Sequence, residues 1–295
     1  MAKTMPKRID NVIEEGFSMV KGNYLEFLSL YLIFVALFAI IFVAALAIFL
    51  AVAVGGGWSG TNAAGSAMLF IILLVLGVIF LLEPLWIGSY YAIAVQNMSG
   101  RRVSAWDAIS MAKDRYVKLL WTMALETLVF IAVDAVIFSP LAVPSIGFIN
   151  AYAASGSMSN AVGSSLLPLI GLAIVLIIVY LLASAALAPL LYEAVPLVML
   201  EGVSGVGAVK ESIEIGRGNF WNIIWLVVLF GIIYGAVVFA QNLVAFAMQV
   251  LGHLAGSILA LIISFLVGAF LTAWFYVLPI IFYNDFLRKG LRQGR

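Results

Sequence analysis

Hydrophobic residues form six long blocks along this chain, separated by short polar segments. The blocks cover roughly residues 24–54, 67–95, 117–138, 166–200, 220–251 and 254–286. A helix needs about 20 mostly apolar residues to cross the hydrocarbon core of a bilayer. The pattern therefore predicts an all-α polytopic membrane protein with six transmembrane helices.

The last two blocks are separated only by a short segment around Gly252, His253 and Gly256. Together the two blocks are about twice as long as one span requires, so we expect a tight helical hairpin. His253 would then lie in an outer turn, and a single histidine is a poor basis for a metal site, which generally needs several clustered ligands.

The basic residues all fall in alternate connections between the blocks. They are Lys3, Lys7, Arg8, Lys21, Arg101, Arg102, Lys113, Arg115, Lys118, Lys210, Arg217, Arg288, Lys289, Arg292 and Arg295. The opposite connections, including 55–66 and 139–165, contain neither lysine nor arginine. Because basic loops stay in the cytoplasm, both termini are predicted to be cytoplasmic in a multi-pass protein of the cell membrane.

Composition excludes an ordinary soluble domain. The chain is 65% hydrophobic and 10% charged, whereas soluble domains are about 45–50% apolar and about 25% charged. The net charge of +1 and the absence of cysteine give no indication of a nucleic-acid partner or a thiolate metal site. We also find no phosphate-binding loop, zinc-protease motif or nucleophile elbow. We expect no enzyme activity, no metal and no cofactor.

Three segments that precede the odd-numbered blocks align without gaps, at residues 18–24, 110–116 and 214–220. Each contains a basic residue, two turn-forming or polar residues, and then an aromatic residue. The even-numbered blocks each contain a proline that is expected to kink the helix, and these are Pro84, Pro189 and Pro279. The sequence therefore predicts a single transmembrane domain built from repeats at about 9–97, 103–200 and 204–288.

Each predicted repeat begins with a short amphipathic helix. In the first of them, Ile9, Val12, Ile13, Phe17 and Val20 follow helical spacing. One interpretation places these helices in the headgroup plane, and the other packs them on the helical bundle. We favour the headgroup plane, because an aromatic residue suited to the interface follows each helix.

A motif in the second half of the chain resembles a known family. Residues 195–202 (VPLVMLEG) are followed by 208–212 (AVKES) and 218–221 (GNFW). This order resembles the P-x-x-x-x-E-G, A-x-x-x-S and n-F-w pattern of the membrane domain attached to some glycerophosphodiester phosphodiesterases. Related six-helix bacterial and archaeal membrane proteins of unknown function share it. The membrane domain is not the catalytic part there, so the resemblance implies a membrane module without phosphodiesterase activity.

Four acidic residues lie within the predicted spans, namely Glu83, Glu126, Glu193 and Asp134. An unpaired charge inside a membrane is costly, so such residues are candidates for function. One interpretation is a polar cavity or a proton- or cation-coupled path that Glu83, Glu126 and Glu193 line. The alternative is structural, with protonated carboxyls that hydrogen-bond between helices.

Small residues recur every fourth position along the sixth block. They include Gly256, Ala260, Ser264 and Gly268, and the fifth block adds Gly231 and Gly235. Small residues let helix backbones approach closely in lipid. One interpretation is packing of helices within one molecule, and the other is a dimer interface. We favour packing within one molecule.

The sequence thus favours a non-enzymatic scaffold or accessory module that associates with membrane lipids or with a partner membrane protein. The alternative is a small-solute or lipid transporter with a cavity lined by the embedded carboxylates. A nucleic-acid partner is not expected.

Overall fold

The computed structural model describes residues 9–55, 61–155, 167–251 and 253–284. Within these ranges the chain is almost entirely helical and contains no strand. The elements are α1 (Ile9–Gly22), α2 (Tyr24–Gly55), α3 (Thr61–Met98), α4 (Ala105–Asp114), α5 (Tyr116–Phe138), η1 (Ser139–Leu141), α6 (Ala142–Ser155), α8 (Leu167–Leu191), α9 (Ala194–Glu201), α10 (Val206–Leu251) and α11 (His253–Phe282). Six of the helical segments are long and apolar enough to cross a membrane, which confirms the predicted spans.

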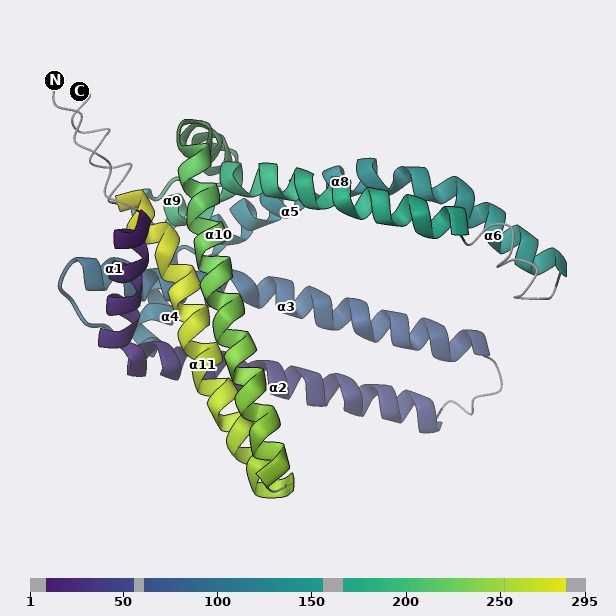
Figure 1. Cartoon of the computed structure of the whole chain (residues 1–295), viewed down its shortest axis with the longest axis horizontal. Helices are drawn as coiled ribbons and strands as arrows, with labels where there is room; N and C mark the ends of the chain where they lie inside the picture. The colour runs from purple at the N-terminus through teal and green to yellow at the C-terminus, as the bar shows by residue number, and fades with distance from the viewer. Residues whose placement is uncertain (1–8, 56–60, 156–166, 252, 285–295) are drawn as a thin grey trace.

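The helices form a packed hub from which three hairpins extend (Figure 1). The hub consists of α1, α4 and α9 together with the ends of the long helices that pack on them. The hairpins are α2–α3, α5–α8 and α10–α11. The first two point the same way in Figure 1, whereas α10–α11 leaves the hub in a different direction. The hairpin predicted around Gly252 is present, because α10 and α11 lie side by side.

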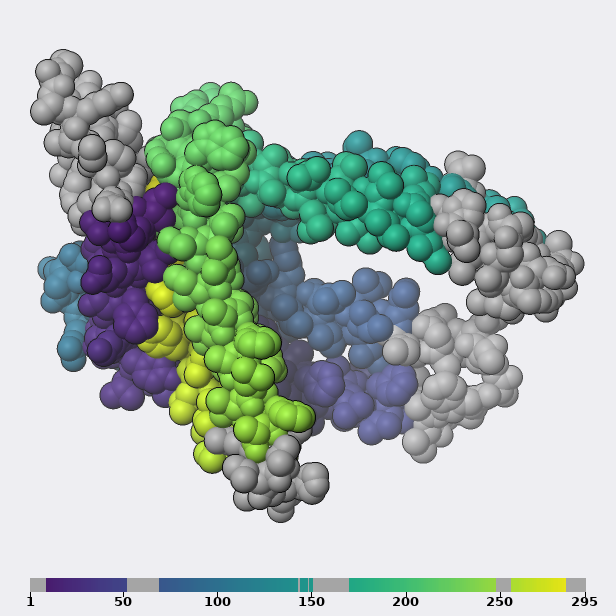
Figure 2. Space-filling model, viewed as in Figure 1, coloured from purple at the N-terminus to yellow at the C-terminus, as the bar shows by residue number. Residues whose placement is uncertain are grey.

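The distal parts of the hairpins differ sharply from the hub in burial. We call these parts the arms, and they comprise residues 35–51, 69–82, 124–138, 170–187, 231–247 and 256–268. Apart from Ala45, Leu176 and Ala260, no arm residue in these described ranges is buried. Figure 2 shows open space between the arm of α3 and the arm of α8.

The chain turns at an equivalent position before each odd-numbered span. A turn at Asn23 separates α1 from α2, Arg115 separates α4 from α5, and Asn219 interrupts α10 with φ −124° and ψ 19°. The side-chain amides of Asn23 and Asn219 each donate a hydrogen bond to the carbonyl four residues earlier, at 2.9 and 3.2 Å. These three residues occupy the same column of the sequence alignment.

The short helices pack on the bundle. In α1, Val12, Ile13 and Val20 are buried, and the indole Nε1 of Trp274 on α11 donates a hydrogen bond to the carbonyl of Ile13 at 3.1 Å. Most of the apolar face of α1 is therefore occupied by protein, and Phe17 is the exposed exception at 42%. The sequence pattern favours a placement of α1 in the headgroup plane, but packing on the helical bundle describes this helix better. Its apolar stripe is largely buried against α11, so little of the stripe is left to contact lipid.

Two expectations about chain geometry need correction. The connection at 139–165 is not simply a loop, because η1 and α6 occupy its first part, where the residues are mostly apolar and compatible with a helix. The return segment at 166–200 is divided between α8 and α9 at Tyr192 and Glu193, whereas α3 and α11 continue through Pro84 and Pro279.

Ser212 on α10 stabilises the break after Pro189. Its hydroxyl donates to the carbonyl of Leu190 at 2.8 Å and accepts from the backbone N–H of Glu193 at 3.1 Å. Both backbone groups would otherwise bond within a continuous helix. The break therefore depends on a contact between helices as well as on the proline.

The closest helix approaches lie in the hub. A Cβ on Gly216 would lie 2.5 Å from the carbonyl oxygen of Pro189, and one on Gly88 would lie 2.7 Å from a Leu119 methyl carbon. By contrast, a Cβ on Gly231 or Gly235 would meet no atom within 4 Å. The close packing predicted at Gly231 and Gly235 was wrong, because both lie on the exposed arm of α10.

Along the small-residue ridge of α11 the contacts vary. Ala260 is buried, whereas Ser264 is exposed. The Gln241 amide of α10 donates to the carbonyl of Ser264 at 3.5 Å. A Cβ on Gly268 would lie 3.6 Å from the Tyr31 hydroxyl, and Gly256 is partly buried. The ridge thus meets neighbouring helices at some positions and open space at others.

Candidate functional site

A cavity of about 340 Å³ lies where the first two hairpins leave the hub. Residues of α3, α5, α8, α9 and the segment that joins α8 to α9 line it. The polar lining residues are Glu83, Tyr91, Glu126, Thr127 and Tyr192. The apolar lining residues are Ile87, Met123, Phe130, Ala188, Leu191 and Val195.

Glu83 and Glu126 come from different hairpins and face the same cavity. Glu83 is exposed, whereas Glu126 is partly buried and its Oε1 has no hydrogen-bond partner in the described structure. The two carboxyls lie within electrostatic range of one another. Glu83 lies about 22 Å along the helix from the end of α3 at Met98. It therefore falls within the segment Leu69–Met98, which is long and apolar enough to cross a membrane and in which an uncompensated carboxylate is costly.

Glu193 lies behind the cavity wall. Its side chain is fully buried, and neither carboxyl oxygen has a hydrogen-bond partner among the residues that the structure describes. It does not line the cavity, but its neighbour Tyr192 does. Tyr91 is within electrostatic range of both Glu193 and Glu126. The structure therefore brings Glu83 and Glu126 into one cavity, with Glu193 sealed beside it.

Asp134 lies elsewhere on α5. Phe138 and Tyr180 are in ring contact across the hairpin with centroids 5.7 Å apart. Because α5 and α8 run antiparallel, the residue four positions before Phe138 lies opposite the residue four positions after Tyr180. This register places Asp134 opposite Ser184. The Asp134 Oδ1 and the Ser184 hydroxyl are both buried without a hydrogen-bond partner in the described structure. Asp134 is thus separate from the cavity that contains Glu126.

Basic side chains at the start of α5 position the cavity wall that α9 forms. The Arg115 guanidinium donates to the carbonyls of Val198 and Met199, and Lys118 Nζ donates to the carbonyl of Gly202 at 3.0 Å. Cations at a helix C-terminus satisfy free carbonyls and complement the helix dipole. Gly202 has φ +74°, the left-handed conformation that favours glycine at a helix end.

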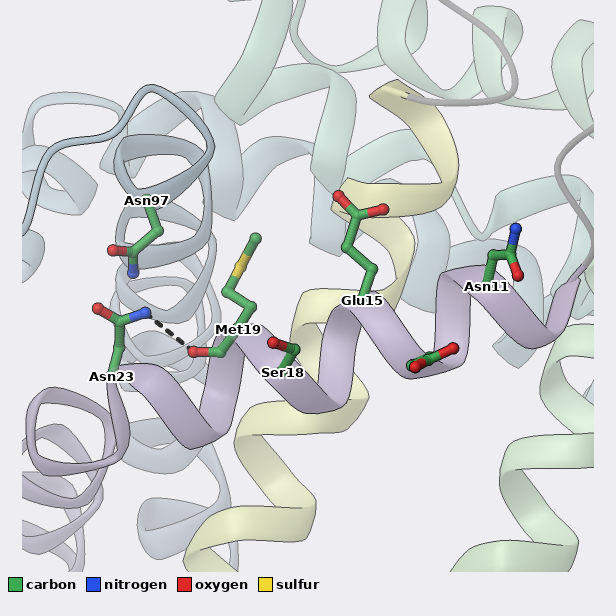
Figure 3. A pocket seen from close by; sticks show the side chains of 7 residues that line it. Asn11, Glu15, Ser18, Met19, Asn23 and Asn97 are labelled. Carbon is green, nitrogen blue, oxygen red and sulfur yellow. Dashed lines mark hydrogen bonds between the residues drawn. The ribbon is translucent and has the colours of Figure 1, made fainter.

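A second, more open pocket of about 480 Å³ lies along α1. Figure 3 shows Asn11, Glu15, Ser18 and Asn23 along this helix, and Asn97 of α3 next to Asn23. The Asn23 amide bonds to the Met19 carbonyl, so it completes the turn between α1 and α2. This pocket is a polar surface of the hub, and we assign it no chemistry.

Sequence reasoning missed Tyr91, Thr127 and Tyr192 as cavity residues. Tyrosine and threonine are common in apolar helices, and no spacing distinguishes those that face a cavity. Ser212 belonged to the family-like motif, but its role at the Pro189 break depends on α10 packing against α8. No group of three or more His, Cys, Asp or Glu that could hold a metal ion is found within residues 9–55, 61–155, 167–251 and 253–284.

A comparison with protein families matches residues 31–285 to a domain of unknown function, DUF7847. No curated protein and no solved structure matches the chain. Nothing in these comparisons links the chain to the membrane domain of glycerophosphodiester phosphodiesterases, so that resemblance stays a prediction.

Proposed function

We propose that this chain, which belongs to the DUF7847 family of unknown function, is a non-enzymatic membrane module whose hub holds three hairpins apart so that lipid packs between them. The observation that carries the proposal is the contrast in burial between hub and arms. Large apolar side chains on opposed arms are exposed, such as Leu73 on α3 (59%) and Leu182 on α8 (67%). Acyl chains can cover such surfaces without protein partners, because lipid is as apolar as leucine.

We propose that the hub lies at the cytoplasmic side of the cell membrane, with both termini there. Every lysine and arginine in the described part of the chain lies in a hub helix or in a turn beside one, as Lys21, Arg102 and Arg217 illustrate. The positive-inside rule favours this orientation. The equivalent turns at Asn23, Arg115 and Asn219 support the further proposal that the chain contains three repeated units.

Distances between spin labels in lipid nanodiscs test the proposal. The chain has no cysteine, so paired cysteines introduce labels cleanly. Labels at Leu73→Cys and Leu182→Cys should lie well beyond the ~10 Å separation of packed helices. The matched pair Ile87→Cys and Val195→Cys, at two residues that line one cavity, should give a short distance. Two equally short distances would show that the arms close in a bilayer and would contradict the proposal.

Transport of a small solute or lipid is a second candidate function, and the cavity that contains Glu83 and Glu126 favours it. If the carboxyls serve transport, Glu83→Gln should abolish flux into proteoliposomes without lowering the yield of folded protein. Glu83 is exposed, so its side chain contributes little to packing. Unchanged flux in this variant would exclude a transport role for Glu83.

A further inference from the structure

We propose that the cavity between Glu83 and Glu126 binds an organic ammonium ion, that is, an amine-bearing group attached to an apolar body. The proposal shares its cavity with the transport hypothesis but requires only binding. It also does not depend on lipid between the arms. The experiment below therefore measures binding without flux.

The charge of the cavity favours a cation. Two carboxyls face it from separate hairpins, and no lysine, arginine or histidine is among the described residues that line it. The Glu126 Oε1 is buried without a hydrogen-bond partner in the described structure. Burying an unpaired carboxylate is costly. A bound ammonium group would donate hydrogen bonds to both carboxyls and offset their mutual repulsion.

The tyrosines of the cavity give a second and independent indication. Tyr91 is 5% exposed and lines the cavity. Tyr192 and Phe130 add two further aromatic rings to the wall. Aromatic faces attract ammonium groups through cation–π interactions, most strongly where water is excluded.

The size and walls of the cavity favour an organic ion over a metal. A volume of about 340 Å³ is at the lower end of the range for small-molecule sites, about 300–1,000 Å³. Most of the remaining wall is apolar, including Ile87, Leu191 and Val195. A divalent metal requires several clustered oxygen or nitrogen ligands, and the described residues contain no cluster of three or more acidic, histidine or cysteine side chains.

The ligand can approach from the space between the first two hairpins. Glu83, Thr127 and Ala188 line the cavity and are exposed, and open space separates the arms of α3 and α8 (Figure 2). A lipid headgroup that carries an ammonium group and a free amine offer the same chemistry to this site. The experiment must therefore distinguish the two sources.

Saturation-transfer NMR on the purified full-length chain, in nanodiscs of phosphatidylglycerol only, tests the site with benzylammonium as the probe. Benzyl alcohol is the neutral control of nearly equal shape. We expect saturable binding of benzylammonium with at least tenfold preference over benzyl alcohol. Glu126→Gln and Glu83→Gln should each lower the affinity at least tenfold, whereas Asp134→Asn should not change it. Should Glu126→Gln fail to fold, the exposed Glu83 position still decides the question.

Native mass spectrometry identifies the source of the ligand. The natural ligand is a lipid headgroup if the protein retains more bound phosphatidylethanolamine than bound phosphatidylglycerol, and if Glu83→Gln removes that preference. Benzylammonium binding without such a lipid preference assigns the site to a free amine. Equal affinity for benzylammonium and benzyl alcohol, or affinity that neither glutamine variant changes, would overturn the proposal.

Discussion

Leu182 lies on the arm of α8, in the second hairpin, with 67% of its surface exposed, whereas Leu197 lies in α9, in the hub, and is fully buried. Both belong to one return segment of nearly uniform hydrophobicity. The difference shows that hydrophobicity alone does not bring helices together in this protein. In a bilayer, close packing and hydrogen bonds provide that force, and the hub supplies them through glycines, Ser212 and Arg115.

Replacing the two leucines tests this contrast most strongly. Leu197→Ala leaves a cavity in a packed region and should lower the free energy of unfolding by about 3 kcal/mol. Leu182→Ala, on the arm, should change it by less than about 0.5 kcal/mol. Reversible unfolding of the purified protein in mixed micelles measures both. Equal losses would mean that the arms are packed as tightly as the hub.

Two glycines of α10 give a second matched pair. In Gly216→Ala the new Cβ would lie 2.5 Å from the Pro189 carbonyl oxygen, so backbone must shift. We expect a loss of about 2 kcal/mol, which is typical of overpacking. Gly231→Ala meets open space and should stabilise the helix by up to about 1 kcal/mol. The same unfolding assay distinguishes them, and a destabilised Gly231→Ala would reveal a helix contact on the arm.

Removing the side-chain cap of α9 should lower the free energy of unfolding by a smaller amount. Arg115→Met removes the hydrogen bonds to the carbonyls of Val198 and Met199 and should cost about 1.5–2 kcal/mol. Lys113→Met on the exposed face of α4 is the control and should be nearly neutral. If the two variants unfold alike, Arg115 does not stabilise the hub through this cap.

The smallest expected effect concerns the attachment of α1. Trp274→Phe removes the hydrogen bond from the indole to the Ile13 carbonyl and should cost about 1 kcal/mol. Hydrogen exchange should become faster in α1 and remain unchanged in the other hub helices. Trp225→Phe, at a residue that is 61% exposed on α10, is the control. Unchanged exchange in α1 would show that apolar packing alone holds this helix.

Much of the fold was predictable because membrane spans have a strong local signal. A run of about 20 apolar residues is sufficient to identify a spanning helix, and all six were found. The glycines of α10 were less predictable. Gly231 and Gly235 have the spacing of a glycine packing motif but face open space, whereas Gly216 has no glycine four residues away and makes the close approach. Spacing reports which residues share a helix face, and it does not report what that face meets.

The candidate site shows the same division. The cost of burying charge identified Glu83, Glu126 and Glu193 from sequence, because few ionisable residues interrupt the spans. Only the tertiary structure placed Glu83 and Glu126 in one cavity and sealed Glu193 behind its wall. The sequence does not reveal this arrangement, because α3 and α5 belong to different hairpins and a local sequence pattern does not specify how hairpins are oriented.

The sequence by itself determined the helical class, the number of spans and the positions of the embedded acids, since each follows from the hydrophobicity of single segments. The tertiary structure decided that α1 packs on α11, that the return segment breaks after Pro189, and that the arms separate beyond the hub. These features depend on contacts between residues far apart in the chain, such as Ser212 with Leu190 and Trp274 with Ile13. In lipid such contacts arise from shape and hydrogen bonding, which a hydrophobic pattern does not encode.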